Sequence, residues 1–221
     1  MADMTFEESQ KMLRERFSDL GPWVSRYVVN GISNGGWFDV LTDVRVAKWI
    51  ATLDRKESIL ECGSLEGGHT ALLARSPGVR HVLGVEYREA NLAKCRFAHE
   101  VMNLKNTEFR QCDLDTEDLE QFGQFDAVWC SGVLYHLMRP VQFFRKITAN
   151  SVFLGTHYSL EAEDEFEGQR GRWYTEQGYA DVLSGASPQS FWLTLGNICE
   201  MASDCGFTIY DMKTSEAPNG P

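Results

Sequence analysis

From Glu57 onward, short apolar runs alternate with segments in which apolar residues recur at helical spacing. The strand-like runs cover residues 57–62, 81–86, 108–112, 125–130, 151–156 and 207–212. The helical patterns between them cover residues 67–75, 88–102, 115–122, 138–148 and 189–205. Alternating strands and helices with short joints predict an α/β, doubly wound fold, with a mainly parallel sheet and helices on both faces. Ligands of such sheets bind beyond the carboxyl ends of the strands.

The first quarter of the chain follows a different pattern. Residues 5–18 begin with a potential N-cap, Thr5, and place apolar residues at helical spacing, and Gly21-Pro22 then breaks the pattern. A glycine-rich loop and a second helical pattern, residues 43–53, follow. We therefore expect an N-terminal helical cap over residues 1–50 and a ligand-binding domain over residues 51–221.

One long segment, residues 157–188, separates the fifth predicted strand from the last predicted helix. Long insertions of this kind are often lids over a binding site, and we expect a lid here. Its acidic run at 161–167 is most simply a solvated face.

Composition narrows the class of protein. A chain of 221 residues with 43% hydrophobic residues can bury a full core, and no apolar run approaches the roughly 20 residues of a membrane span. The acidic start lacks the features of a signal peptide, so we expect a cytoplasmic protein that does not enter a membrane. The six cysteines and five histidines show no metal-ligand spacing, so no metal site is expected. A net charge of −11 disfavours nucleic acid as a partner.

The stretch "LECGSLEGGHT", residues 60–70, joins a predicted strand to a predicted helix through a glycine turn. A dinucleotide fingerprint requires a second glycine two places after the first, and Leu65 stands there. A phosphate-binding P-loop is excluded as well, because no Gly-Lys-Ser/Thr follows. The turn therefore favours a nucleotide-like ligand without a pyrophosphate.

Three acidic residues accompany the turn. Glu61 lies beneath it, Glu86 ends the second predicted strand where a carboxylate can accept both hydroxyls of a ribose, and Asp113 follows the third strand within reach of an adenine amino group. Asp115 or Glu117 could replace Asp113 in that role, or these two residues could simply cap the next helix. Carboxylates without a fixed cation suit a ligand that is a nucleoside at one end and positively charged at the other.

Four motifs in this order resemble the class I S-adenosylmethionine-dependent methyltransferases, over about residues 57–212. They are "ILECGSLEGG", "GVEYRE", "CDLD" and "FDAVWCSGVLYHLMRP". The resemblance implies a Rossmann-like fold, S-adenosylmethionine as cofactor and S-adenosylhomocysteine as product. It also implies a set of cofactor-binding residues: Glu61, Gly63, Ser64, Gly67, Glu86, Tyr87, Asp113, Leu114 and Cys130.

Two features depart from the family pattern. Many members have glycine where this chain has Leu65, so the methionine end of the cofactor is expected to be held differently. The family sheet usually closes with a seventh, antiparallel strand, and here little sequence follows the sixth predicted strand. Within the superfamily, "SFWLT" and "ICEMASDCGF" resemble a narrower group that includes tRNA wobble-uridine carboxymethyltransferases.

The acceptor side is less constrained by sequence. His136 follows the fourth strand and could take a proton from the acceptor, or it could only orient against the cofactor; Tyr135 is a second catalytic candidate. Four aromatic residues are candidate walls of an acceptor pocket, although most aromatic residues belong to cores: Trp37, Tyr158, Trp173 and Tyr174.

No segment typical of amino-methylating nucleic-acid enzymes, of cytosine C5 enzymes or of magnesium-dependent catechol-type enzymes is present. The leading interpretation is a methyltransferase acting on a small-molecule acceptor, as a monomer or homodimer. The alternatives are a tRNA wobble-base methyl or carboxymethyl transferase and a non-catalytic S-adenosylmethionine-binding protein.

Overall fold

The computed structural model describes residues 4–215, which form two compact units. The first unit contains the chain up to Leu134 together with Lys146–Thr156, and the second contains Tyr135–Arg145 and the residues from His157 onward. The N-terminal residues that we expected to form a cap thus belong to the same unit as the main sheet. No helix within residues 4–215 combines the length and apolar character needed to cross a bilayer.

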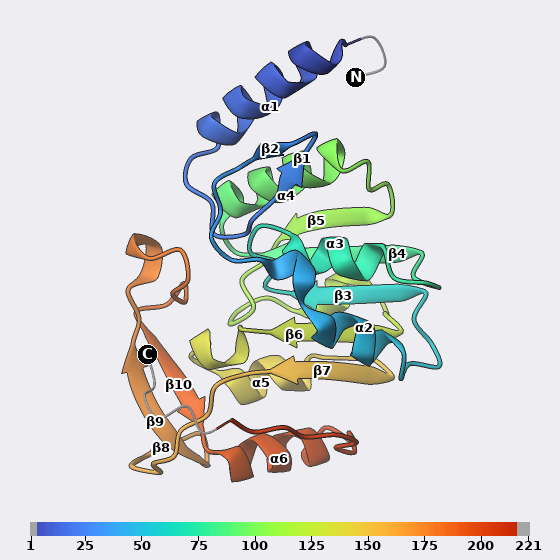
Figure 1. Cartoon of the computed structure of the whole chain (residues 1–221). Helices are drawn as coiled ribbons and strands as arrows, with labels where there is room; N and C mark the ends of the chain where they lie inside the picture. The colour runs from blue at the N-terminus through green and yellow to red at the C-terminus, as the bar shows by residue number, and fades with distance from the viewer. Residues whose placement is uncertain (1–3, 216–221) are drawn as a thin grey trace. The chain divides into compact units, whose positions relative to one another are not determined.

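The first unit is built around a five-stranded parallel sheet with the order β5-β4-β3-β6-β7 (Figure 1). Its strands are β3 (Ser58–Cys62), β4 (His81–Glu86), β5 (Thr107–Gln111), β6 (Ala127–Ser131) and β7 (Ser151–Gly155). Its helices are α1 (Phe6–Asp19), α2 (Val44–Ile50), α3 (Gly68–Ala74) and α4 (Glu89–Val101), with short 3-10 turns η1 (Val40–Thr42) and η2 (Leu119–Phe122). The strand order reverses between β3 and β6, so a ligand is expected at the carboxyl ends of these strands.

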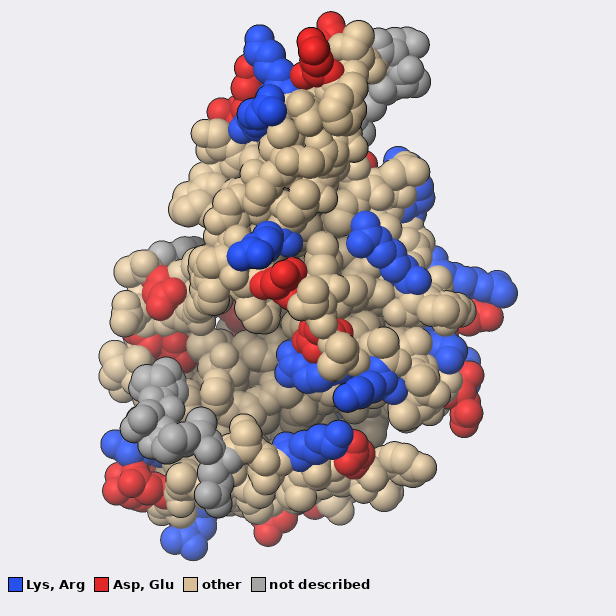
Figure 2. Space-filling model, in the orientation of Figure 1, with Lys and Arg blue, Asp and Glu red and all other residues tan. Residues whose placement is uncertain are grey.

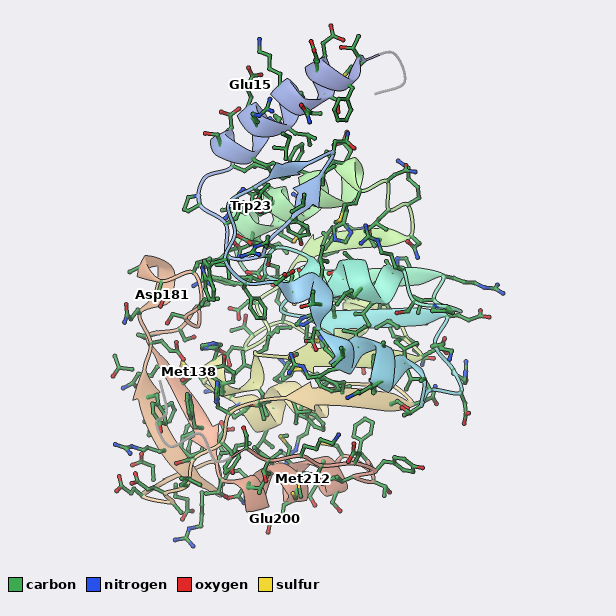
Figure 3. The ribbon with its side chains drawn as sticks, in the orientation of Figure 1. Glu15, Trp23, Met138, Asp181, Glu200 and Met212 are labelled. Atoms are coloured by element: carbon green, nitrogen blue, oxygen red, sulfur yellow. The ribbon has the colours of Figure 1, made fainter. Side chains whose placement is uncertain are left out.

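The N-terminal segment packs on α4. Thr5 is the N-cap of α1, as the sequence indicated, and it forms a reciprocal capping box with Glu8. A small hairpin of β1 (Val28–Val29) and β2 (Ile32–Ser33) follows. Trp23, labelled in Figure 3, belongs to an apolar cluster that includes residues of this segment and of α4: Leu13, Phe17, Trp23, Tyr27, Ile32, Phe97 and Ala98.

The second unit contains a three-stranded antiparallel sheet with the order β10-β9-β8. Its elements are β8 (Asp164–Phe166), β9 (Gln169–Thr175), η4 (Gly178–Ala180), β10 (Gln189–Leu193), α5 (Pro140–Arg145) and α6 (Leu195–Asp204). The 3-10 turn η3 (Leu134–His136) lies where the chain passes from the first unit to the second.

Three sequence-based element predictions were wrong. Residues 189–205 are not one helix, because β10 ends at Leu193 and Thr194 caps α6 by accepting a hydrogen bond from the Asn197 amide. Residues 207–212 form coil rather than a strand, and of residues 115–122 only η2 is helical. The α/β, doubly wound fold class itself is confirmed.

Candidate functional site

The glycine turn after β3 is shaped by two positive-φ glycines. Gly63 has a φ of +74°, and a Cβ there would lie 2.1 Å from Cγ2 of Val133. Gly67 has a φ of +82°, and its Cβ would lie 2.9 Å from Nε2 of His99. The amides of Gly63 and Ser64 both donate to the Val85 carbonyl at 2.9 Å, which joins the turn to β4. Both glycines are therefore required by the backbone, whatever the ligand.

Leu65 adopts a positive φ of +49° at the tip of this turn. Such a conformation favours glycine, which agrees with the glycine that many class I methyltransferases have at this position. The Leu65 amide donates to Oε2 of Glu86 at 3.0 Å. The leucine side chain is tolerated, and its backbone connects the turn to the end of β4.

Glu86 ends β4 with a carboxylate that is only 7% exposed. It accepts hydrogen bonds from the amides of Leu65 and Arg88 and from Nδ2 of Asn91, at 3.0, 2.9 and 3.2 Å. Burial raises the pKa of Glu86, although these hydrogen bonds oppose the shift. They account for three of the roughly four hydrogen bonds that a carboxylate accepts. A ribose that uses both of its hydroxyls would therefore displace one of these donors.

Glu61 lies beneath the turn, as expected, and is 1% exposed. It accepts a hydrogen bond from the Thr70 hydroxyl, and His69 Nδ1 lies 3.8 Å from its Oε1. On its other side the His69 ring contacts Asp43 Oδ2 at 2.9 Å through Nε2. Burial is the main cause that raises the pKa of Glu61 to about 7. Glu61 thus holds the first turn of α3 to β3.

The other predicted cofactor residues also line the carboxyl ends of the strands, with different exposure. The side chains of Ser64, Leu114 and Cys130 are buried, so these residues can reach a ligand mainly through their backbones. Asp113 and Tyr87 are half-buried. Oδ1 of Asp113 accepts the Asp115 amide at 3.0 Å, and Asp118, not Asp115 or Glu117, caps η2 by accepting the Glu120 amide at 3.1 Å.

A buried carboxylate that the sequence analysis did not identify lies in the same turn. Glu66 is 0% exposed and accepts from the amides of Val24 and Ser25 and from Nζ of Lys94, the last at 2.8 Å. The Tyr27 hydroxyl donates to the Glu66 carbonyl at 2.6 Å. The turn is therefore fixed to the N-terminal segment by charge-assisted hydrogen bonds.

In the second unit, His136 pairs with another acid that the sequence analysis did not single out. His136 Nδ1 lies 3.0 Å from Oε1 of Glu176, the residue after β9. The same carboxylate accepts from the hydroxyls of Ser184 and Ser190 and from the Gly185 amide, at 2.5, 2.7 and 2.7 Å. Burial alone would raise the pKa of Glu176, but these hydrogen bonds outweigh it and hold the pKa below its ordinary value.

Aromatic rings surround this pair within the second unit. The Tyr135 ring lies 4.1 Å from the His136 ring and 4.4 Å from the His157 ring, and Trp192 is stacked with Tyr174 at 4.0 Å. Burial raises the pKa of Tyr135 and lowers that of His157. The Tyr135 and Trp192 rings are 5.4 Å apart, so three of the predicted acceptor-side residues belong to one cluster: Tyr135, His136 and Tyr174.

The remaining predicted wall residues are Trp37, Tyr158 and Trp173, for which the described part of the structure shows no ring contact with this cluster. Trp173 neighbours Tyr174 on β9 and so points to the opposite face, where its ring contacts Phe166 and Phe191 at 4.9 and 5.0 Å. Trp37 belongs to the first unit and is 64% exposed, and Tyr158 is half-buried. Their substrate-binding roles stay predictions.

Comparison with known proteins identifies the family. Residues 53–184 match the family model described as "Methyltransferase domain", which covers more than half of the chain. The chain belongs to this methyltransferase family.

Solved structures support the match. The N-terminal domain of EvdMO1, crystallised in the presence of SAH and D-fucose, is 30% identical with a TM-score of 0.83, over 93% of this chain and 91% of that one. A second structure, described as EvdMO1, is 31% identical with a TM-score of 0.66 over 88% of this chain, but this methyltransferase spans only 41% of that chain. Ubiquinone biosynthesis O-methyltransferase of Acinetobacter baumannii (strain AYE) is 34% identical over 29% of this chain, which spans about a quarter (27%) of that relative.

These findings confirm the predicted family and fold, and with the family its cofactor, S-adenosylmethionine. The residues of this methyltransferase fit that cofactor chemically. A buried carboxylate at the end of β4 provides an acceptor for a ribose hydroxyl, and the turn that faces it is free of lysine and arginine, which leaves room for a positively charged group. The sequence-derived cofactor residues stay predictions at the level of individual contacts.

The two acids that the sequence analysis missed differ in how they could have been found. Lys94 stands among the apolar positions of α4, between Leu92 and Cys95, and a charged residue on a buried helix face predicts a buried partner. That signal predicts an acidic partner without identifying which one, and the structure shows that it is Glu66. Glu176 lies forty residues from His136, and no spacing in the sequence relates the two.

Proposed function

We propose that this methyltransferase transfers a methyl group from S-adenosylmethionine to a hydroxyl oxygen of a deoxysugar or of a small molecule that carries one. The acceptor class rests on the similarity to the EvdMO1 N-terminal domain, which extends over nearly the whole length of both chains. That domain was crystallised in the presence of D-fucose. Hydroxyl methylation also agrees with the name of the Acinetobacter relative, an O-methyltransferase.

The cofactor supplies an electrophilic methyl group on a sulfonium. In the proposed reaction, Glu86 accepts a hydrogen bond from a ribose hydroxyl and Asp113 accepts one from the adenine amino group. His136 takes the proton of the acceptor hydroxyl as the oxygen–methyl bond forms, and the sulfonium becomes a thioether. Protons and charges balance, because the cation on sulfur is lost as a proton appears on the imidazole.

Two alternatives carry less support. On the face shown in Figure 2, Lys and Arg side chains are interspersed with Asp and Glu rather than gathered into one basic patch. With a net charge of −11 this surface favours a small acceptor over tRNA. A non-catalytic binding protein would not require the His136–Glu176 pair.

The lid over residues 157–188 and the cytoplasmic location stay predictions.

The cofactor half of the proposal is tested by replacing Glu86. Glu86→Gln removes the charge but keeps the side-chain length, so it preserves most of the packing at the end of β4. Because charge-assisted hydrogen bonds contribute about 1.5–3 kcal/mol, we expect S-adenosylhomocysteine to bind roughly tenfold or more weakly. Calorimetry measures the affinity. Glu108→Gln, which alters a half-exposed carboxylate on β5 paired with Arg110, is the matched control. Equal affinities for all three proteins would overturn the cofactor site.

The acceptor half is tested with labelled S-adenosylmethionine and a panel of acceptors. We expect methylation of D-fucose or its glycosides, detected by transfer of the label and by mass spectrometry of the product. The panel also contains two alternative acceptors. One is a small molecule with catechol hydroxyls, and the other is bulk tRNA at physiological salt. Methylation of the catechol alone would overturn the sugar class, and efficient methylation of tRNA would replace the proposal with the wobble-base alternative.

A further inference from the structure

Four donors converge on the carboxylate of Glu176 in the second unit. Oε1 receives His136 Nδ1 and the Ser190 hydroxyl, and Oε2 receives the Ser184 hydroxyl and the Gly185 amide. The side chain is 8% exposed. A nearly buried carboxylate with all of its acceptor capacity used is a built arrangement rather than a chance surface ion pair.

The backbone around the pair is closely fitted. A Cβ at Gly185 would lie 2.6 Å from the His136 carbonyl oxygen, so only glycine allows the loop after η4 to approach this closely. The Phe191 amide donates to the Leu137 carbonyl at 2.9 Å, which fixes the residue after His136 to β10. His136 is therefore held from both sides, by its ring and by its backbone.

The hydrogen bonds that Glu176 accepts determine which atoms of the His136–Glu176 pair carry protons. The hydrogen bonds on Glu176 hold its pKa below the ordinary value, so the group is an acceptor-only carboxylate near neutral pH. A neutral histidine beside it must carry its proton on Nδ1, which leaves the Nε2 lone pair available as a base. The other titratable side chains around His136 are Tyr135 and His157; burial keeps the first protonated and favours the neutral form of the second.

We propose that Glu176 is a positioning residue that fixes His136 as the Nδ1–H tautomer, so that Nε2 accepts the proton of the acceptor hydroxyl. When the proton moves to Nε2, the imidazolium cation lies beside the Glu176 carboxylate, which stabilises it. This inference rests on the proposed function for its catalytic consequence, but the tautomer itself is a property of the protein alone.

Glu176→Gln tests the inference because the four donors force one orientation on the amide. The Gly185 N–H cannot reverse its direction, so the glutamine carbonyl occupies the Oε2 position and the NH2 group faces His136. That NH2 donates to Nδ1 and moves the histidine proton to Nε2, where it blocks the base. Glu176→Asp keeps the charge and should retain the native tautomer in part.

Nitrogen-15 NMR of the imidazole rings reads the tautomer, and His136→Gln assigns the signal among the five histidines. We expect the Nδ1–H form in the native protein and the Nε2–H form in Glu176→Gln. With the sugar that the native protein methylates as acceptor, kcat of Glu176→Gln should fall by about 10²–10⁴-fold, and the KM for S-adenosylmethionine should not change. Glu176→Asp should recover part of the lost kcat. The control is Glu161→Gln, which alters an exposed carboxylate of the same unit.

The outcomes separate the two proposals. An unchanged tautomer in Glu176→Gln would overturn the positioning role, whatever the activity. A changed tautomer with unchanged kcat would show that His136 is not the base. If the native protein methylates no sugar in the panel, the proposed function fails, while the NMR result still decides whether Glu176 sets the tautomer. Adding His136→Gln to Glu176→Gln should cost little further activity, because the two residues act as one unit.

Discussion

At the scale of single residues, Glu61 is a carboxyl group placed where ionisation is unfavourable. It lies beneath the glycine turn, contacts Thr70 and His69, and has a pKa raised by burial to about 7. In the unfolded chain the same group titrates near 4.5. Between these two pH values the folded protein binds the proton more tightly, so Glu61 contributes stability at low pH that is lost as the pH rises through 7.

Glu61→Gln should remove this dependence. We expect the free energy of unfolding of the native protein, relative to that of Glu61→Gln, to fall by roughly 2–3 kcal/mol between pH 4.5 and 7. Urea unfolding at a series of pH values measures it. His99, whose pKa burial lowers to about 4, contributes the opposite slope below its ordinary value of 6.5, which is why the difference between two proteins is the quantity to compare. Glu57→Gln, exposed and just before β3, is the control, and a constant difference for Glu61→Gln would contradict the burial argument.

Which single residues the sequence could identify depends on how local their signal is. Glu61, Gly63, Gly67 and Glu86 could be predicted because each has a fixed place relative to a strand end. Glu66 adjoins the same motif, yet its partners come from the N-terminal segment and α4, and only the folded chain brings them together.

At the scale of elements, the N-terminal segment and α4 are joined by a buried ion pair. Lys94 Nζ lies 2.8 Å from Oε1 of Glu66, donates also to the Pro22 carbonyl, and lies 5.2 Å from the centroid of the Trp23 ring. Both charged groups are almost fully withdrawn from solvent. Removing one partner leaves the other charge buried and uncompensated.

Lys94→Ala should therefore destabilise the protein by about 3–5 kcal/mol. The matched control is Lys11→Ala, which breaks the exposed pair between Lys11 and Glu15 in α1, where the lysine side chain is 76% exposed; the expected cost is below about 1 kcal/mol. Urea unfolding compares the two variants. Equal losses of stability would mean that the Lys94–Glu66 pair does not fix the N-terminal segment to the turn.

The parallel strands were predictable because each is a short, uninterrupted apolar run that ends near a turn signal. The antiparallel sheet was not, since β8 and β9 lie in an acidic and arginine-containing segment whose alternation is weak. In the stretch 189–205, an apolar strand runs directly into an apolar helix, so periodicity alone could not separate them. The Thr194 cap was the local signal that marks the boundary.

At the scale of the whole molecule, the division into two units separates the predicted cofactor residues from most of the predicted acceptor-side residues, with Trp37 as the exception. The predicted cofactor residues all belong to the first unit, and the His136–Glu176 pair with its aromatic neighbours belongs to the second. Sequence motifs could place the first set relative to the strand ends because each motif adjoins a strand of the parallel sheet. They could not place the second set, because the His136–Glu176 contact joins residues forty positions apart.

This division predicts how S-adenosylhomocysteine changes amide hydrogen exchange. Binding stabilises the state that holds the ligand by about 2.7 kcal/mol at a hundred times the dissociation constant, which slows exchange through unfolding roughly a hundredfold. We expect this protection in the turn after β3 and at the start of α4, where the amides of Leu65 and Arg88 donate to Glu86. The β9–β10 ladder of the second unit is the internal reference and should change much less. Glu86→Gln at the same ligand concentration should lose most of the protection. Equal slowing of the β9–β10 amides and of the turn amides would contradict this prediction. It would mean that the cofactor-binding turn and the antiparallel sheet open together as one cooperative structure.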